Sequence, residues 1–241
     1  MSEPLSMDEL KNYLGNDKHG LVAIIFDAVN AHCFFCTIDK AHENNKGNGL
    51  STNNLILARF IRNGYAAKQL TTIARLLDGR YDSISLVRII KEFKSRLEIE
   101  NMEIPKSDPI KKENSLNRNK LKKLLRKLLR KLETNESLKK IKTDRHKIIA
   151  HMDESHFENP LLSEIKDIEN ALVVLAYVAR ELSYMVSQTI ETFSYYPELA
   201  LNDIFKNLDK PFFFPSEIDN LTKHFLDLQN KMDENIKAFS S

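Results

Sequence analysis

The segment from Ser163 to about Thr192 constrains the fold more than any other part of the chain. Apolar side chains recur along it at intervals of three and four residues, which is the pattern of a helix with a wide buried face. Such a helix needs several neighbours to cover that face. The segment therefore predicts the central core helix of a helical domain. Its apolar positions are Ile165, Ile168, Ala171, Leu172, Leu175, Val178, Leu182, Met185 and Val186.

The same periodicity predicts the helices that surround this core helix. Ser6 and Glu9 form a capping box for a short N-terminal helix, and Ser83 is the expected cap of a later one. With only 6 glycines and 7 prolines, and little strand-type alternation, the chain offers few signals for a sheet. We predict helices over about residues 7–14, 19–43, 52–77, 84–99, 116–132, 136–152 and 163–192, with one or two shorter helices after residue 197.

These helices predict an all-α fold, an antiparallel helix bundle with extra N- and C-terminal helices. A chain of 241 residues with 42% hydrophobic side chains is large enough for one such domain. We assign residues 1–192 to the bundle and residues 193–241 to a helical extension that packs on the bundle or on a dimer partner. The longest uninterrupted apolar run, residues 171–179, is half of a membrane span, and no secretory leader is recognisable. We therefore expect a soluble, cytoplasmic protein with no membrane partner.

The net charge of +2 hides a strongly basic block. Residues 111–142 hold thirteen Lys and Arg against three Glu, so the remainder of the chain is acidic. The leucines of residues 121–132 bury one side of a helix and leave the cations on the others, a pattern shared by polyanion-binding helices and by solvated helix faces. Aromatic residues 195–196 and 212–214 could stack on bases, although such a knot more often caps a bundle or joins a dimer interface. The candidate nucleic-acid-binding residues are Lys122, Lys123, Arg126, Lys127, Arg130 and Lys131.

Two other patterns favour structural roles. Cys33 and Cys36 lie inside a helix on its apolar side, away from the helix N-terminus where redox cysteines are activated, and no second ligand pair completes a zinc site. His146, His151 and His156 are five residues apart, whereas helical metal sites use a spacing of four. We therefore expect buried structural thiols, no metal and no cofactor.

The remaining candidate is the segment around Arg145 and His151. Arginine is a planar donor fork for phosphate, and histidine titrates near neutral pH. Cleavage of RNA without a metal needs a cation for the developing phosphorane charge and groups that accept and donate protons, and these two residue types supply them. His146 would help to orient the phosphate. Asp144 and Asp153 are candidates for tethering the arginine or for fixing the histidine tautomer.

The segment from Asp144 to Asp153 resembles the Arg-x(4–6)-His signature of HEPN domains, with a polar residue directly after the arginine. Its wider frame is similar to the AbiU-like, abortive-infection branch, and residues 73–78 (IARLLD) and 83–90 (SISLVRII) fit that branch in the same order. The resemblance spans about residues 21–192. It implies a dimerising helical bundle and, in many members, a metal-independent endoribonuclease. Many such proteins are toxins of toxin–antitoxin or phage-defence systems, often beside a nucleotidyltransferase antitoxin.

On one continuous helix, Arg145 and His151 would be about 120° apart around the axis and about 9 Å apart along it. A two-fold dimer would overcome this separation because it brings two copies of the motif together. We therefore expect a homodimer with its active site at the interface, an RNA substrate, and an antitoxin as a candidate partner. Asp27 is a further supporting candidate. The alternatives are a non-catalytic HEPN module that binds nucleic acid or a protein, and a structural helical protein in which the Arg/His match is accidental.

Overall fold

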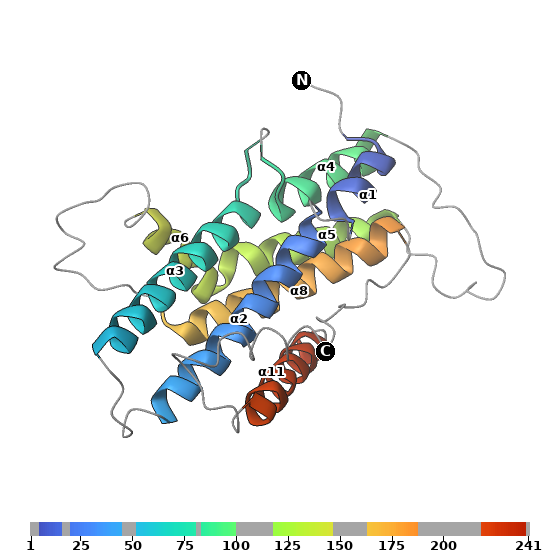
Figure 1. Cartoon of the computed structure of the whole chain (residues 1–241). Coiled ribbons are helices and arrows are strands. Elements are labelled where there is room, and N and C mark those ends of the chain that lie inside the picture. The colour runs from blue at the N-terminus through green and yellow to red at the C-terminus, as the bar shows by residue number, and fades with distance from the viewer. Residues whose placement is uncertain are drawn as a thin grey trace.

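The chain folds into a bundle of helices, seen in a computed structural model that describes residues 5–15, 20–44, 52–80, 83–99, 118–146, 163–187 and 218–239 (Figure 1). No strand occurs within these ranges, as the sequence predicts. The helices are α1 (Met7–Leu14), α2 (Leu21–Asn44), α3 (Thr52–Leu76), α4 (Leu86–Ile99), α5 (Arg118–Thr134), α6 (Glu136–Arg145), α8 (Ile165–Ser187) and α11 (Ile218–Ala238).

Helix α8 is the core helix that its apolar pattern predicts. It packs against each of the other described helices, and every side chain from Ala171 to Ala179 is buried. Figure 1 shows α8 running through the middle of the bundle, with α2 and α3 across one face and α11 along one side. The large apolar area that α8 removes from water is the main stabilising term of the fold.

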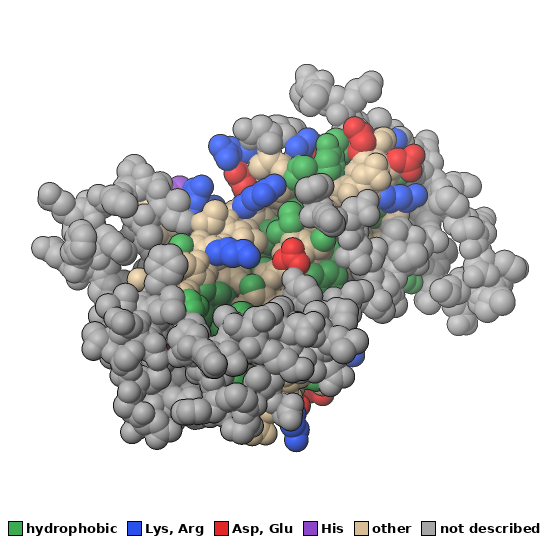
Figure 2. Space-filling model, viewed as in Figure 1, with side chains coloured by type: hydrophobic (Ala, Val, Ile, Leu, Met, Phe, Trp, Pro, Cys, Tyr) green, Lys and Arg blue, Asp and Glu red, His purple; other side chains and the backbone are tan. Residues whose placement is uncertain are grey.

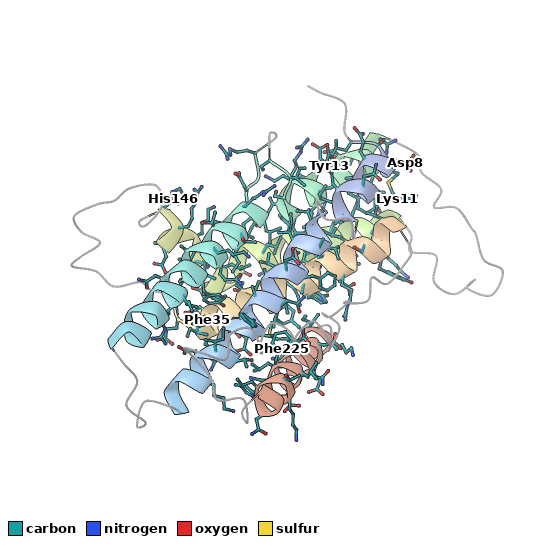
Figure 3. The ribbon with its side chains drawn as sticks, in the orientation of Figure 1. Asp8, Lys11, Tyr13, Phe35, His146 and Phe225 are labelled. Atoms are coloured by element: carbon teal, nitrogen blue, oxygen red, sulfur yellow. The ribbon has the colours of Figure 1, made fainter. Side chains whose placement is uncertain are left out.

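Helix α2 is also apolar over most of its length. Residues Leu21–Lys40 are long and apolar enough to cross a membrane by length and composition, with a mean hydropathy of 1.9, but 67% of that window is buried inside the bundle. The packing of α2 against α11, α8 and α3 accounts for this apolar character. Figure 3 shows Phe35 of α2 and Phe225 of α11 in the interior of this part of the bundle, and both side chains are buried.

The N-terminus is attached to the bundle through main-chain contacts. In the predicted capping box, the Glu9 backbone N–H donates to Ser6 Oγ at 3.2 Å, and the Ser6 backbone N–H donates to Glu9 Oε2 at 2.7 Å. One residue earlier, the Leu5 backbone N–H donates to Glu92 Oε2 at 3.3 Å, and Arg96 donates to the Leu5 carbonyl at 3.0 Å. Because Glu92 and Arg96 are one turn apart on α4, they bind both main-chain polar groups of a single residue, Leu5.

One helix boundary differs from the sequence-based expectation. Helix α4 begins at Leu86, because Ser85 rather than Ser83 accepts a hydrogen bond from the Arg88 backbone N–H at 3.1 Å. Ser83 instead donates to main-chain carbonyls of the preceding turn. The described part of the predicted helix over residues 136–152 is α6, Glu136–Arg145. The later part of that predicted helix, and the aromatic residues 195–196 and 212–214, lie outside the described residues.

Candidate active site and basic helix

Helix α6 carries Arg145 at its last position. The helix begins where the sequence predicts a break, because the Asn135 side chain accepts a hydrogen bond from the Leu138 backbone N–H at 3.0 Å. Its first turn is tied to α8, since Ser137 Oγ donates to Asp167 Oδ1 at 2.8 Å and Lys140 pairs with Asp167 at 3.1 Å. These contacts fix α6 between α3 and α8 and thereby set where Arg145 emerges.

Asp144 is almost fully buried, with 1% of its surface exposed. Its Oδ2 atom accepts a hydrogen bond from the Ser163 backbone N–H at 2.7 Å. This contact joins the end of α6 to the residues that precede α8, across the intervening stretch of chain that contains His151. Asp144 therefore has a structural role of its own, in addition to the predicted support of the arginine or the histidine.

Arg145 is partly buried beside the connection between α3 and α4. Its Nε atom is buried and has no hydrogen-bond partner among the described residues. The pKa of Asp78 lies below its usual value, chiefly because the Arg80 side chain donates to this carboxylate, and the charge of Arg145 lowers it further. Arg145 thus lies in the electrostatic field of the Asp78 carboxylate, which accepts hydrogen bonds from Arg80.

The other predicted site residues are distributed as follows. His146 is exposed, and Figure 3 shows it at the free end of α6, on the periphery of the bundle. Its backbone N–H donates to the carbonyls of Lys142 and Thr143, so its main chain continues the last turn of α6. Asp27 is exposed on α2, and no described contact joins it to Arg145. His151 and Asp153 lie outside the described residues, so their distances to Arg145 stay predictions.

The described residues of the turn between α3 and α4 carry a set of polar contacts that the sequence analysis did not assign to the candidate site. Asp78 accepts from the Arg80 backbone N–H at 3.1 Å and from Arg80 Nε at 2.8 Å, and the Asp78 carbonyl accepts from the hydroxyls of Ser83 and Ser85. A Cβ on residue 79 would lie 3.1 Å from Lys91 Nζ, so Gly79 allows this turn to pack closely on α4. Figure 2 shows Lys and Arg side chains next to acidic ones over this α3–α4 region.

The basic helix α5 presents only part of its predicted nucleic-acid-binding set to solvent. Four of the six cations are exposed and form one stripe along the helix: Lys123, Arg126, Lys127 and Arg130. Lys122 pairs with Glu98 of α4 at 3.8 Å and keeps 21% of its side chain exposed. The exposed stripe is therefore the part of α5 that is available to a polyanion.

Lys131, the sixth cation, has an intramolecular role. Its Nζ atom lies 4.5 Å from the ring centre of Tyr177 and 4.1 Å from that of Phe239, and it donates to the Phe239 carbonyl at 3.4 Å. Burial between these groups and the charge of Lys127 lower the pKa of Lys131. The lysine thus connects α5, α8 and the C-terminal end of α11 through cation–π contacts.

A buried polar cluster joins α2 to α3, separate from the candidate active site. His32 is 3% exposed, and its Nδ1 atom lies 2.6 Å from the hydroxyl of Tyr65. Burial lowers the pKa of His32 to about 4. Cys33 and Cys36 are free thiols whose pKa burial raises to about 12 and about 11, which agrees with the predicted structural role. Within the described ranges, no three His, Cys, Asp or Glu side chains are grouped so that they could hold a metal ion.

Comparison with known proteins supports the resemblance that the motif segments suggest. The model of AbiU2 proteins, within the HEPN group, matches residues 18–205 of this chain. The chain belongs to the AbiU2 family. No curated protein and no solved structure is significantly similar to it.

The AbiU2 match contains α2 to α8 and therefore the Arg145 segment and both supporting segments in the α3–α4 region. Helices α1 and α11 lie outside it. Both pack onto the matched part, α1 against α8 and α2, and α11 against α2 and α8. The AbiU2 bundle of this chain is thus extended at both ends, and Gln229 of α11 donates to Asn30 of α2 at 2.7 Å within the resulting buried contact.

Proposed function

We propose that this AbiU2 protein is a HEPN-type endoribonuclease that needs no metal ion and acts as a toxin in a toxin–antitoxin or phage-defence system. The observation that carries the proposal is the Arg145–His151 spacing at the end of α6, inside the residues that match the AbiU2 family. The partly buried arginine supports it, because burial strengthens the interaction of a guanidinium with an arriving phosphate.

The proposed reaction is attack of the 2′-hydroxyl on the adjacent phosphorus. The 2′-oxygen forms a new bond to phosphorus while the bond from phosphorus to the 5′-oxygen breaks, which gives a 2′,3′-cyclic phosphate and a 5′-hydroxyl. His151 takes the proton from the 2′-hydroxyl or supplies the proton to the 5′-oxygen. Arg145 binds the non-bridging oxygens as their negative charge grows, and His146 orients the same phosphate.

One copy of the motif supplies only one catalytic histidine in this scheme, whereas the reaction uses a base and an acid. We propose that a two-fold homodimer places two motifs side by side and provides the second group. The exposed position of His146 at the periphery of the bundle is compatible with such an interface. In the cell, the proposed location is the cytoplasm, and the proposed protein partner is an antitoxin, of the nucleotidyltransferase type or another. Asp153 stands where one branch of the family has a modifiable tyrosine, so we expect no control by that modification.

The test uses purified protein, total RNA and tRNA in the presence of EDTA. We expect Arg145→Ala and His151→Ala to lower the cleavage rate by at least about a hundredfold while the helical circular-dichroism spectrum stays unchanged. Matched controls are Arg62→Ala, an exposed arginine that pairs with Asp39 at 3.3 Å, and His224→Ala on α11. End-group analysis should find 2′,3′-cyclic phosphate. Equal cleavage rates for the wild type and both motif variants would refute the proposal that the protein is an enzyme.

The exposed stripe on α5 favours a second candidate function, a non-catalytic module that binds nucleic acid. Both functions predict RNA binding that weakens steeply with salt, and only the first predicts cleavage. The dimer is tested separately by sedimentation across a dilution series. A fully active monomeric variant would show that the active site does not need the partner chain.

A further inference from the structure

The α3–α4 turn brings a second arginine to the neighbourhood of Arg145. Arg80 is bound to Asp78 through its Nε atom at 2.8 Å and its terminal nitrogen at 2.7 Å, yet 72% of its side chain is exposed. Its guanidinium therefore combines a fixed attachment with a solvent-facing side. Such a group is suited to binding an oxyanion without a large loss of side-chain freedom, because the carboxylate has already ordered it.

The charge of Arg145 acts on the same carboxylate from another helix, α6. Helix α6 packs directly on α3, and Asp78 follows the last residues of α3. The charge of Arg145 acts on Asp78, while the Arg145 Nε atom has no hydrogen-bond partner among the described residues. Asp78 thus binds the guanidinium group of Arg80 and lies in the electrostatic field of that of Arg145, and the three side chains together carry a net charge of +1. A phosphodiester carries one negative charge, so it would neutralise the trio.

Hydrogen bonds join the described residues on the two sides of this turn, 78–80 and 83–85, to each other and to α4. The hydroxyls of Ser83 and Ser85 both donate to the Asp78 carbonyl, and Ser85 also caps α4. Arg88 donates to the Ser83 carbonyl at 3.2 Å and fixes the end of the turn to α4. These bonds hold Asp78 in one position relative to α4, so that Arg80 depends on Asp78 for its orientation.

We propose that Arg80 binds a backbone phosphate of single-stranded RNA next to the phosphate held by Arg145, and that Asp78 is the positioning residue, which binds Arg80 directly and attracts Arg145 through its charge. The inference rests on the proposed endoribonuclease function and extends its substrate site to the α3–α4 turn. Single-stranded RNA is the expected substrate because a duplex holds the 2′-oxygen away from in-line attack on its phosphate. The family segment at residues 73–78 thereby acquires a role: it ends on the carboxylate that organises the two arginines.

The binding test is made with His151→Ala protein and a fluorescent oligouridylate, so that no cleavage occurs. We expect Arg80→Gln to weaken binding several-fold at low salt and to lower the slope of log Kd against log salt by about 0.7, the value for one phosphate contact with a single strand. Arg62→Gln is the matched control, because it is also an exposed arginine paired with an aspartate. An Arg80 variant that binds like the Arg62 variant would overturn the proposal.

The kinetic test uses Asp78→Asn in otherwise wild-type protein. Asparagine keeps an acceptor for the Arg80 backbone N–H but loses the charge that holds two guanidinium groups. We expect kcat to fall while KM stays the same or decreases, because the arginines still attract RNA but are no longer aligned. A rise in KM with unchanged kcat would refute the positioning role. If the wild type cleaves no RNA, the salt slopes of the binding test still decide whether Arg80 contacts phosphate, so the two proposals fail separately.

Discussion

The buried histidine of α2 makes the stability of the bundle depend on pH. His32 is 3% exposed, and burial lowers its pKa from 6.5 to about 4, with an opposing contribution from the charge of Glu169. The unfolded chain therefore binds a proton at this site below about pH 6.5, while the folded protein does not do so until about pH 4. Since the unfolded state binds more protons in this window, the free energy of unfolding falls as the pH falls.

The size of the effect follows from the two pKa values. With 6.5 for the unfolded chain and about 4 for the folded protein, linkage predicts a loss of about 1.4 kcal/mol at pH 5.5 and about 2.5 kcal/mol at pH 4.5, both relative to pH 8. Below about pH 3 the loss from this site levels off at about 3.4 kcal/mol, because both states are then protonated. A loss of this size is a large fraction of the stability of a typical domain.

The assay is urea unfolding followed by far-UV circular dichroism at pH 8, 5.5 and 4.5, for the wild type and for His32→Gln. Glutamine does not titrate, and its amide can still hydrogen-bond to the Tyr65 hydroxyl that lies 2.6 Å from the His32 ring. The variant is expected to lose less stability than the wild type on acidification, by about 2.5 kcal/mol at pH 4.5. His224→Gln is the control, because His224 is more exposed and should give a smaller difference. Wild-type and His32→Gln profiles of equal slope would refute the assignment of this pH dependence to His32.

Two further perturbations test contacts that the site depends on. Asp144→Ala leaves the Ser163 backbone N–H without its buried acceptor and should lower the free energy of unfolding by about 1–3 kcal/mol. Asp144→Asn should restore part of this loss. Equal free energies for the two variants in urea unfolding would contradict the prediction. Lys131→Met removes the cation between two aromatic rings and should lower the free energy of unfolding by about 1 kcal/mol, without changing the salt slope of RNA binding. Lys127→Met should instead lower that slope and leave the free energy of unfolding within about 0.5 kcal/mol of the wild-type value.

The helices and the core were predictable because they depend on local periodicity. The stripe of α8 specifies a buried helix whatever its neighbours are, and the capping residues Ser6 and Asn135 mark helix starts through contacts three residues away. The cap of α4 was not predicted correctly, because Ser83 and Ser85 are equally suitable in sequence. The packing of the α3–α4 turn decides between them, since it turns the Ser83 hydroxyl toward main-chain carbonyls.

The candidate site was predictable only in part. The spacing of Arg145 and His151 is visible in the sequence, and so is the charge of α5. The assignment of Lys131 to an aromatic pair is not, because Phe239 is 108 residues away along the chain. The proximity of Arg145 to the Asp78 turn likewise arises from the packing of α6 on α3. No local pattern reports such a contact.

The central position of α8 has a consequence for synthesis of the protein. This helix packs against each of the other described helices, yet it lies late in the chain, with 143 residues between the end of α2 at Asn44 and its own end at Ser187. At a translation rate of about 5–20 residues per second, the apolar faces of α2 therefore wait roughly 7–30 s for α8 to be complete. During that interval the nascent helices have no complete core. Folding to the finished bundle is thus postponed until most of the chain has been made, although α6 and its neighbour α3 are both synthesised before α8.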